Sequence, residues 1–167
     1  MRIFIGTLYT IENEYEECVQ SIHQQSFHNF DHFIFRNLPN KEAHARLFRS
    51  FLDQADIYDA LIKVDADMVL SRTTLFAEIV AELETNPWAQ VLSIAVHDFF
   101  SDELIWGLNA YRNTVRWDFN KETLFVDRPN LPKENYLTNN SELAPAAYHC
   151  KNPSPYQAFH FGVHRGL

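Results

Sequence analysis

The sequence predicts an α/β protein of three layers, with a mostly parallel central sheet and an irregular C-terminal segment. Apolar runs typical of buried strands alternate with amphipathic helical patterns over residues 2–97. This alternation is typical of parallel sheets with right-handed crossovers. The chain has 167 residues, of which 46% are hydrophobic, and this fits one globular domain with a sizeable core.

Two strand and helix units are expected in the first part of the chain. The run RIFIGTLY predicts a strand over residues 2–9. Asn13 is expected to cap the following helix, with Glu16 completing a capping box. A second strand is expected over residues 31–36, and the second helix from Asn40, because apolar residues recur after it at helical spacing.

The third strand lies in the run ALIKVDADMVLS, residues 60–71. Ser71 is expected to cap a third helix, which Pro87 closes. The runs QVLSIAVH and ELIWGLNAY predict two further strands, over residues 90–97 and 103–111.

The last third of the sequence is irregular. Turn-forming residues dominate after about residue 112, and a helical pattern returns only in the final stretch, SPYQAFHFGVHRGL. We expect one domain over residues 1–167. The chain stops directly after that helical stretch, which leaves open that it is one module of a longer protein.

Charge and cysteine content restrict the classes of function. A net charge of -8 argues against a nucleic-acid partner, because binding to the phosphate backbone needs clustered Lys and Arg. No apolar run approaches the roughly 18 residues of a membrane span, and no signal-peptide pattern opens the chain. Cys18 and Cys150 fit neither a disulfide framework nor a zinc site, so a reducing cytoplasm is the simpler expectation.

Asp65 and Asp67 stand where the third strand is expected to end, and they form the only Asp-x-Asp in the chain. Ligands of open α/β sheets bind outside the carboxyl ends of the strands. Two adjacent carboxylates repel one another, and a divalent cation removes that conflict. Oxygen ligands favour Mg²⁺ or Mn²⁺. Because of the repulsion, we expect Asp67→Asn to leave the stability of the metal-free protein unchanged or to raise it; a solvated turn is the alternative for the pair.

The segment VDADMVLSRTTL resembles the Asp-x-Asp region of nucleotide-diphospho-sugar glycosyltransferases with the GT-A fold, family-2-like bacterial enzymes in particular. The stretch IFIGTLYTIENEYEECVQSIHQQSF is similar to their first strand and helix, and AFHFGVHRG to a late segment that contains histidine. The resemblance implies a Rossmann-like GT-A fold. Residues 1–97 would be the nucleotide-binding half, and residues 98–167 would bind the acceptor and complete the metal site.

The implied activity is metal-dependent transfer of a sugar from a nucleotide-diphosphate donor, a UDP-sugar in the first place, to a glycan or another hydroxyl acceptor. The family usually has an Asp-Asp-Gly-Ser turn where this chain has RNLPN, so Asn37 is expected to replace the aspartate of that turn. The nucleotide contacts that the resemblance implies are Gly6, Thr7, Tyr9, Asn37, Arg46 and Asp65.

The metal site implied by the resemblance joins the two halves of the chain. Mn²⁺ or Mg²⁺ would be held by Asp67 and by His160, with His164 or His149 as the next candidates. Asp98, at the end of the fourth strand, is the first candidate for the base that deprotonates the acceptor hydroxyl. The other candidates for this base are Asp102, Glu103 and Asp127.

Two other classes remain open. Haloacid-dehalogenase-like phosphatases also have an Asp-x-Asp after an apolar strand, and would use Asp65 as nucleophile and Asp67 as general acid. That motif normally ends the first strand of their core, whereas two strand and helix units precede it here. The second class is a non-catalytic module that binds nucleotide sugars, which turnover of a sugar nucleotide would separate from an enzyme.

Overall fold

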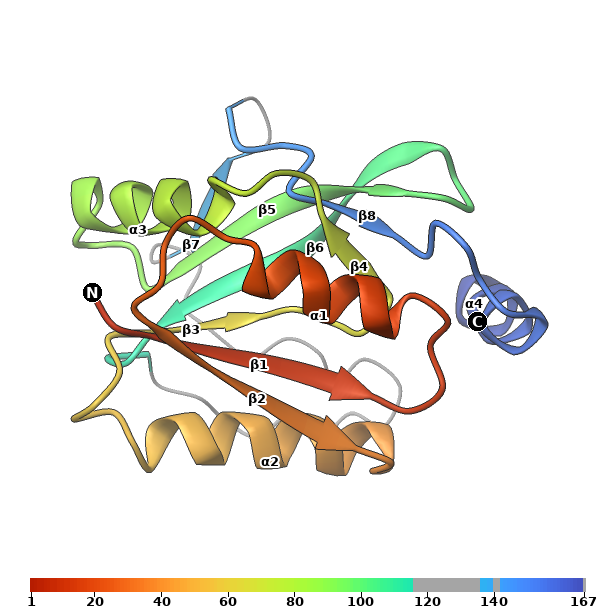
Figure 1. The fold of residues 1–167 in the computed structure, drawn as a ribbon, viewed down its shortest axis with the longest axis horizontal. Coiled ribbons are helices and arrows are strands. Elements are labelled where there is room, and N and C mark those ends of the chain that lie inside the picture. Colours follow the sequence, from red (N-terminus) through yellow and green to blue (C-terminus); the bar gives the residue numbers. More distant parts are fainter. Residues whose placement is uncertain (116–135, 140–141, 167) are drawn as a thin grey trace.

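One mixed sheet forms the centre of the computed structural model, which describes residues 1–115, 136–139 and 142–166, with the side chains of 136 and 164–166 left out (Figure 1). Within these ranges the strands are β1 (Ile3–Tyr9), β2 (Phe30–Arg36), β3 (Ala60–Lys63), β4 (Met68–Leu70), β5 (Val91–Asp98), β6 (Glu103–Arg112), β7 (Tyr136–Asn139) and β8 (Ala147–His149). The helices are α1 (Tyr15–His23), α2 (Asn40–Leu52), α3 (Leu75–Thr85) and α4 (Pro155–Gly166).

The strand order is β2-β1-β3-β6-β5-β8-β4, and β7 pairs with β5 beside this path. β1 is parallel to β2 and β3, and β5 is parallel to β7 and β8. β6 runs antiparallel between β3 and β5, and β4 runs antiparallel to β8. The predicted α/β fold with a mostly parallel sheet is therefore confirmed, with two antiparallel strands that make the sheet mixed.

The helices cover both faces of the sheet, as three layers require. Ile3 and Ile5 of β1 face the core cluster that contains the apolar sides of α1 and α3. Phe4, between them, faces the second cluster, which contains Leu47 and Phe51 of α2. This period-two alternation buries both faces of the strand, which is why its sequence is a continuous apolar run.

Polar residues that were expected to cap helices bind the C-terminal segment instead. Glu14 rather than Asn13 directly precedes α1 and makes no side-chain cap bond. The Asn13 side chain donates to the carbonyl oxygen of Asn152 at 3.1 Å. The Ser71 hydroxyl donates to the carbonyl oxygen of Pro145 at 2.6 Å, and α3 begins only at Leu75. Both capping predictions were wrong, because tertiary hydrogen bonds replaced the local ones.

The C-terminal segment folds back along the body of the domain. β8 pairs with β5 and β4, and α4 lies beyond the ends of β1 and β2, at the right of Figure 1. Buried Glu14 anchors the segment by accepting hydrogen bonds from the backbone N–H of Asn152 at 2.8 Å and from the Gln157 side chain at 2.9 Å. His149 and Cys150 are thereby held beside Asp67, which follows β3.

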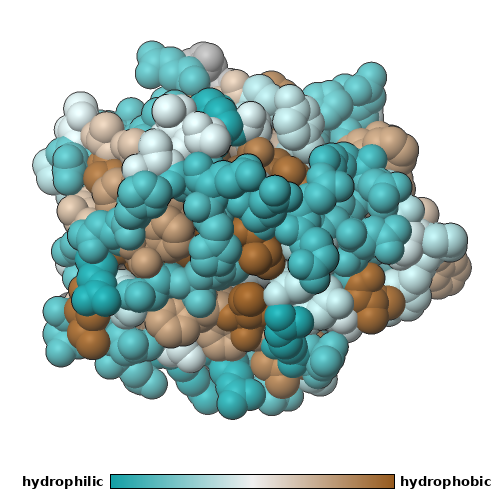
Figure 2. Space-filling model, in the orientation of Figure 1, coloured by the Kyte–Doolittle hydropathy of each residue, from teal (hydrophilic) through white to brown (hydrophobic). Residues whose placement is uncertain are grey.

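The surface on the side of α1 is mostly hydrophilic, with hydrophobic side chains scattered between polar ones (Figure 2). None of the helices in the described part of the chain is both long enough and apolar enough to cross a membrane.

Gly6 of β1 allows α2 to approach the sheet closely. A Cβ atom at this position would lie 2.5 Å from Cδ1 and 3.0 Å from Cγ of Leu47, a side chain that is completely buried. We predict that Gly6→Ala destabilises the protein by about 1–3 kcal/mol through overpacking. Urea unfolding followed by circular dichroism measures this.

Gly162→Ala is the matched control, because a Cβ at Gly162 of α4 meets nothing within 4 Å. Helix propensity then favours the alanine by up to about 1 kcal/mol. A Gly6→Ala protein as stable as the wild type would contradict the assignment of Gly6 to packing.

Candidate metal and nucleotide site

The chain that follows β3 presents two acids on one side. It continues along β1 as far as Ala66 and then turns, with the backbone N–H of Met68 donating to the Asp65 carbonyl oxygen at 2.9 Å. The backbone N–H groups of Val64 and Ala66 donate to β1, at the carbonyl oxygens of Gly6 and Leu8. The side chains of Val64 and Ala66 are buried. Those of Asp65 and Asp67, which alternate with them along the chain, are partly exposed. The spacing of two residues thus places both carboxylates on the same side, away from the core.

Each of the two acids has its own cationic partner. Buried Lys63 donates to Oδ2 of Asp65 at 2.5 Å. Nε2 of His149 lies 3.4 Å from Oδ2 of Asp67. These two cations offset the expected repulsion between the aspartates. We therefore now expect Asp67→Asn to lower the stability of the protein, instead of leaving it unchanged or raising it.

His149 is held from behind by Asp98. The two residues are directly opposite one another in the parallel pairing of β5 and β8, and Nδ1 of His149 lies 2.7 Å from Oδ1 of Asp98. Asp98 is completely buried, and its other oxygen accepts hydrogen bonds from the backbone and hydroxyl of Ser101 at 2.9 and 2.7 Å. This arrangement places a proton on Nδ1 and directs Nε2 toward Asp67.

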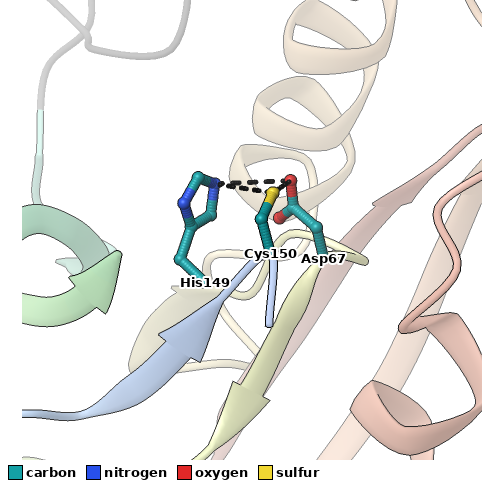
Figure 3. Close-up of side chains that lie close together, drawn as sticks. All are labelled: Asp67, His149 and Cys150. Atoms are coloured by element: carbon teal, nitrogen blue, oxygen red, sulfur yellow. Dashed lines mark hydrogen bonds and ion pairs between the residues drawn. The ribbon is translucent and has the colours of Figure 1, made fainter. Parts of the chain in front are cut away.

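Cys150 completes the group through an unusual backbone conformation. Its φ angle is 51°, in the left-handed region, and this breaks the alternation of a strand. Its side chain consequently lies on the same side as that of His149, with Sγ 3.6 Å from Nε2. The thiol also donates to Oδ2 of Asp67 at 3.3 Å, and its backbone N–H donates to the Asp67 carbonyl oxygen at 2.8 Å. Figure 3 shows the three side chains converging.

Burial and pairing together set the protonation of this group. Burial favours the neutral form of Asp67, but the hydrogen bond and charge of His149 hold the pKa of Asp67 below its usual range. Burial opposes charge on His149 as well, yet its contacts with Asp67 and Cys150 raise its pKa to about 12. Burial raises the pKa of the Cys150 thiol to about 12. These contacts favour the charged form of His149 between the carboxylates of Asp67 and Asp98.

The residues fit a bound cation. Oδ1 of Asp67 is buried and has no hydrogen-bond partner in the described structure. Asp67, His149 and Cys150 offer ligand atoms that all lie within 4.8 Å of one another, and no other such group occurs in the residues the structure describes. Burial raises the pKa of Glu12, and the charge of Asp67 raises it further, so the field of the Asp67 carboxylate reaches Glu12.

The histidine that meets Asp67 is His149, one of the second choices from the sequence. His160 is exposed on α4, with its ring 5.9 Å from that of Tyr156. The side chain of His164 lies outside the described residues, as does Asp127. Asp98 lies at the site as expected, but its burial and its two occupied oxygens argue against the predicted role as catalytic base.

Some of the residues predicted to contact the nucleotide make contacts inside the protein. Gly6 lies beneath Leu47, and Thr7 is buried with its hydroxyl 2.9 Å from Nε2 of His32. Arg46 is exposed on α2. Their contacts with a nucleotide stay predictions.

Tyr9 and Asn37 share the carboxyl ends of β1 and β2, where the backbone N–H of Asn37 donates to the Tyr9 carbonyl oxygen at 2.9 Å. The ring of Tyr9 lies 4.0 Å from that of Tyr15. The guanidinium of Arg36 lies 5.1 Å from the Tyr9 ring and 4.8 Å from the Tyr15 ring, and it donates to the Tyr15 hydroxyl. This edge therefore offers two aromatic rings and a cation.

Sequence reasoning did not assign Cys150, Lys63 or Arg36 to the site. For Lys63 a signal existed, because it stands at the same spacing before Asp65 as Asp67 stands after it. Cys150 directly follows a candidate histidine, but its direction depends on a positive φ angle that the sequence does not reveal.

No family model matches the sequence, and no curated protein matches it, but solved structures share its fold. The TarS 1-349 fragment of S. aureus superposes with a TM-score of 0.59 at 11% identity, over 96% of this chain and 63% of that one. A glycosyltransferase involved in glycosylation of the PBCV-1 major capsid gives 0.58 at 10% identity, over 97% and 100%. A Pyrobaculum calidifontis mannosyltransferase gives 0.56 at 11% identity, over 98% and 60%.

The fold is thus that of the GT-A-like nucleotide-sugar glycosyltransferases, as the sequence resemblance implied. Identities near one tenth show the shared fold alone. The chain spans somewhat less than two thirds of the length of two of these structures and the full length of the third.

The pairing of Asp67 with His149 leads to a stability prediction. Asp67→Asn is expected to destabilise the metal-free protein by about 1.5–3 kcal/mol, because it removes the charged partner of a buried imidazolium. Urea unfolding in the presence of a chelator measures the change.

The control is Asp102→Asn. Asp102 is 91% exposed and pairs with His97 at 3.1 Å, so its loss is expected to change stability by less than about 1 kcal/mol. An Asp67→Asn protein that is more stable than the wild type would support repulsion between Asp65 and Asp67 as the dominant interaction.

Proposed function

We propose that the protein is a metal-dependent glycosyltransferase that moves a sugar from a nucleotide-diphosphate donor, a UDP-sugar in the first place, to a glycan or another hydroxyl acceptor. The observation that carries the proposal is the contact between Asp67 and His149 in a GT-A-like fold. The acid that ends the Asp-x-Asp meets a histidine from the C-terminal segment there. TarS has been solved with UDP, and the mannosyltransferase with GDP-Man and Mn²⁺, which supports a nucleotide-sugar donor and a metal.

Asp67 and His149 are the residues that would hold Mn²⁺ or Mg²⁺. Such an ion supplies positive charge to the diphosphate as it becomes the leaving group. Asp98 acts through His149, because its bond to Nδ1 fixes the tautomer in which Nε2 is free to bind the ion. We assign Asp98 as a positioning residue for this reason.

The acceptor hydroxyl needs a different base. Asp98 has no exposed surface, so an acceptor cannot reach its carboxylate. Asp102 and Glu103, at the turn between β5 and β6, are both exposed. They are the candidates for this base among the residues that the structure describes. Asp127 is the further candidate from the sequence.

The donor would extend from the metal toward the ends of β1 and β2. Lys63 holds Asp65 in place for the ribose contact that the family resemblance implies. Tyr9 offers an aromatic face to a nucleobase, and Arg36 offers positive charge at the same edge.

Binding and turnover separate this proposal from its rivals. Transfer or hydrolysis of a UDP-sugar in the presence of Mn²⁺ would support an enzyme, and metal-dependent binding without turnover would support a non-catalytic module. Phosphate release from p-nitrophenyl phosphate would support the phosphatase instead.

Calorimetric titration of UDP and Mn²⁺ into variants identifies the histidine ligand. Asp67→Asn is expected to abolish metal-dependent UDP binding. His149→Ala is expected to weaken Mn²⁺ affinity by roughly 10 to 100-fold, about 1.4 to 2.8 kcal/mol.

His160→Ala serves as the control and is expected to bind Mn²⁺ with UDP like the wild type, because His160 lies on the exposed side of α4. The reverse result, a loss in His160→Ala and none in His149→Ala, would return the metal site to the first choice made from the sequence.

Tyr9 can be tested separately from the metal. Tyr9→Ala is expected to weaken UDP binding by roughly 5 to 100-fold, since base–aromatic stacking contributes about 1–3 kcal/mol. Tyr9→Phe keeps the ring and is expected to keep most of the affinity. Equal affinity of all three proteins for UDP would place the nucleobase elsewhere.

A further inference from the structure

The three ligand atoms at the metal site form a triangle of definite size. Oδ2 of Asp67 lies 3.4 Å from Nε2 of His149 and 3.3 Å from Sγ of Cys150. Sγ and Nε2 are 3.6 Å apart. The spacing of ligand atoms around an ion depends on bond length and coordination angle, so the triangle can be compared with the geometry that each metal prefers.

These separations allow one tetrahedral ion to reach all three ligand atoms. Bond lengths of about 2.0 Å to oxygen and nitrogen and about 2.3 Å to sulfur give edges of roughly 3.3 Å for O–N, 3.5 Å for O–S and 3.6 Å for N–S. Octahedral Mg²⁺, with bonds of about 2.0–2.1 Å at right angles, gives edges of roughly 2.9 Å between neighbouring oxygen or nitrogen ligands. The observed contacts are hydrogen-bond and ion-pair distances, so they show that one ion can reach all three residues, and the ligand types decide which ion is favoured.

The chemical types of the three ligands favour zinc. Carboxylate, imidazole and thiolate together form a donor set typical of zinc, and a thiolate selects soft or borderline ions over Mg²⁺ and Mn²⁺. We propose that Asp67, His149 and Cys150 form a three-ligand tetrahedral site with higher affinity for zinc than for manganese. This inference rests on the metal site of the proposed function and names its ion.

The surroundings fix each of the three ligands. Asp98 orients His149 through Nδ1, as an outer partner of a metal-binding imidazole does. The left-handed backbone at Cys150 and its N–H bond to the Asp67 carbonyl oxygen hold the thiol beside the carboxylate. The side chains of Asp67 and His149 keep 21% and 15% of their surface exposed, so solvent reaches this group of ligands.

Zinc binding would displace protons. The Zn–S bond forms as the Cys150 thiol releases its proton to solvent, and any proton on Nε2 of His149 leaves to solvent as the Zn–N bond forms. The charge of the ion then offsets the carboxylate of Asp67. Asp98 keeps its hydrogen bond to Nδ1 throughout.

Cadmium and cobalt report this coordination without any assay of activity. Titration of Cd²⁺ into the metal-free full chain is expected to produce the ultraviolet charge-transfer band of a cadmium–thiolate bond, and Co²⁺ the strong visible absorption of a tetrahedral site. Cys150→Ser is expected to lose the thiolate band and to weaken Zn²⁺ binding by roughly 10 to 100-fold, while Mn²⁺ affinity changes much less.

Cys18→Ser is the matched control, because Cys18 is also buried near the two aspartates but donates only to the carbonyl oxygen of Asp65 at 3.6 Å. It is expected to keep the thiolate band and the wild-type Zn²⁺ affinity. If Cys150→Ser does not fold, Cys150→Ala replaces it, and the band of the wild type still shows whether a thiolate binds.

The outcome separates this inference from the proposed function. No thiolate band in the wild type, or equal Zn²⁺ affinity in wild type and the Cys150 variant, would overturn the inference even if Mn²⁺ still supports UDP binding. A thiolate band that depends on Cys150 supports the inference even in a protein that binds no nucleotide, and such a protein would refute only the glycosyltransferase.

Discussion

The contact between Asp67 and His149 is the interaction on which the arrangement of the site depends. It joins the loop after β3 to the end of β8, and it requires the C-terminal segment to pair along β5. The hydrogen bonds of Glu14 and Ser71 with that segment keep it in place. A ligand set drawn from two distant parts of the chain therefore relies on backbone pairing that is already part of the central sheet.

Desolvated charge explains why each acid of the site has a cationic partner. Buried carboxylates are costly unless they are neutralised by hydrogen bonds and opposite charge. Asp65 meets Lys63, whereas Asp67 and Asp98 share His149 between them. The charged form of His149, which these contacts favour, offsets the two carboxylates.

The sequence predicted the fold well because the fold follows from patterns of short range. The alternation of apolar runs and helical faces predicted β1, β2, β3, β5 and β6, whereas β4 was not predicted as a separate strand; Asp65 and Asp67 were correctly placed at a strand end. The antiparallel direction of β6 and the pairing of β4 with β8 depend on contacts between distant segments, so they leave no periodicity in the sequence. The two failed helix caps, at Asn13 and Ser71, have the same cause.

In the candidate site, too, local features could be predicted from the sequence and long-range contacts could not. Asp67 was identified because its spacing and strand position are local features, whereas the choice of His149 over His160 depends on which residue β5 brings beside Asp98. Cys18 and Cys150 stand 132 positions apart in the sequence (150 − 18), and Cys150 acquires its neighbours only through a positive φ angle. A pair of acids alone indicates a hard ion. The thiol next to them, which only the fold places there, is the reason for proposing zinc at this site.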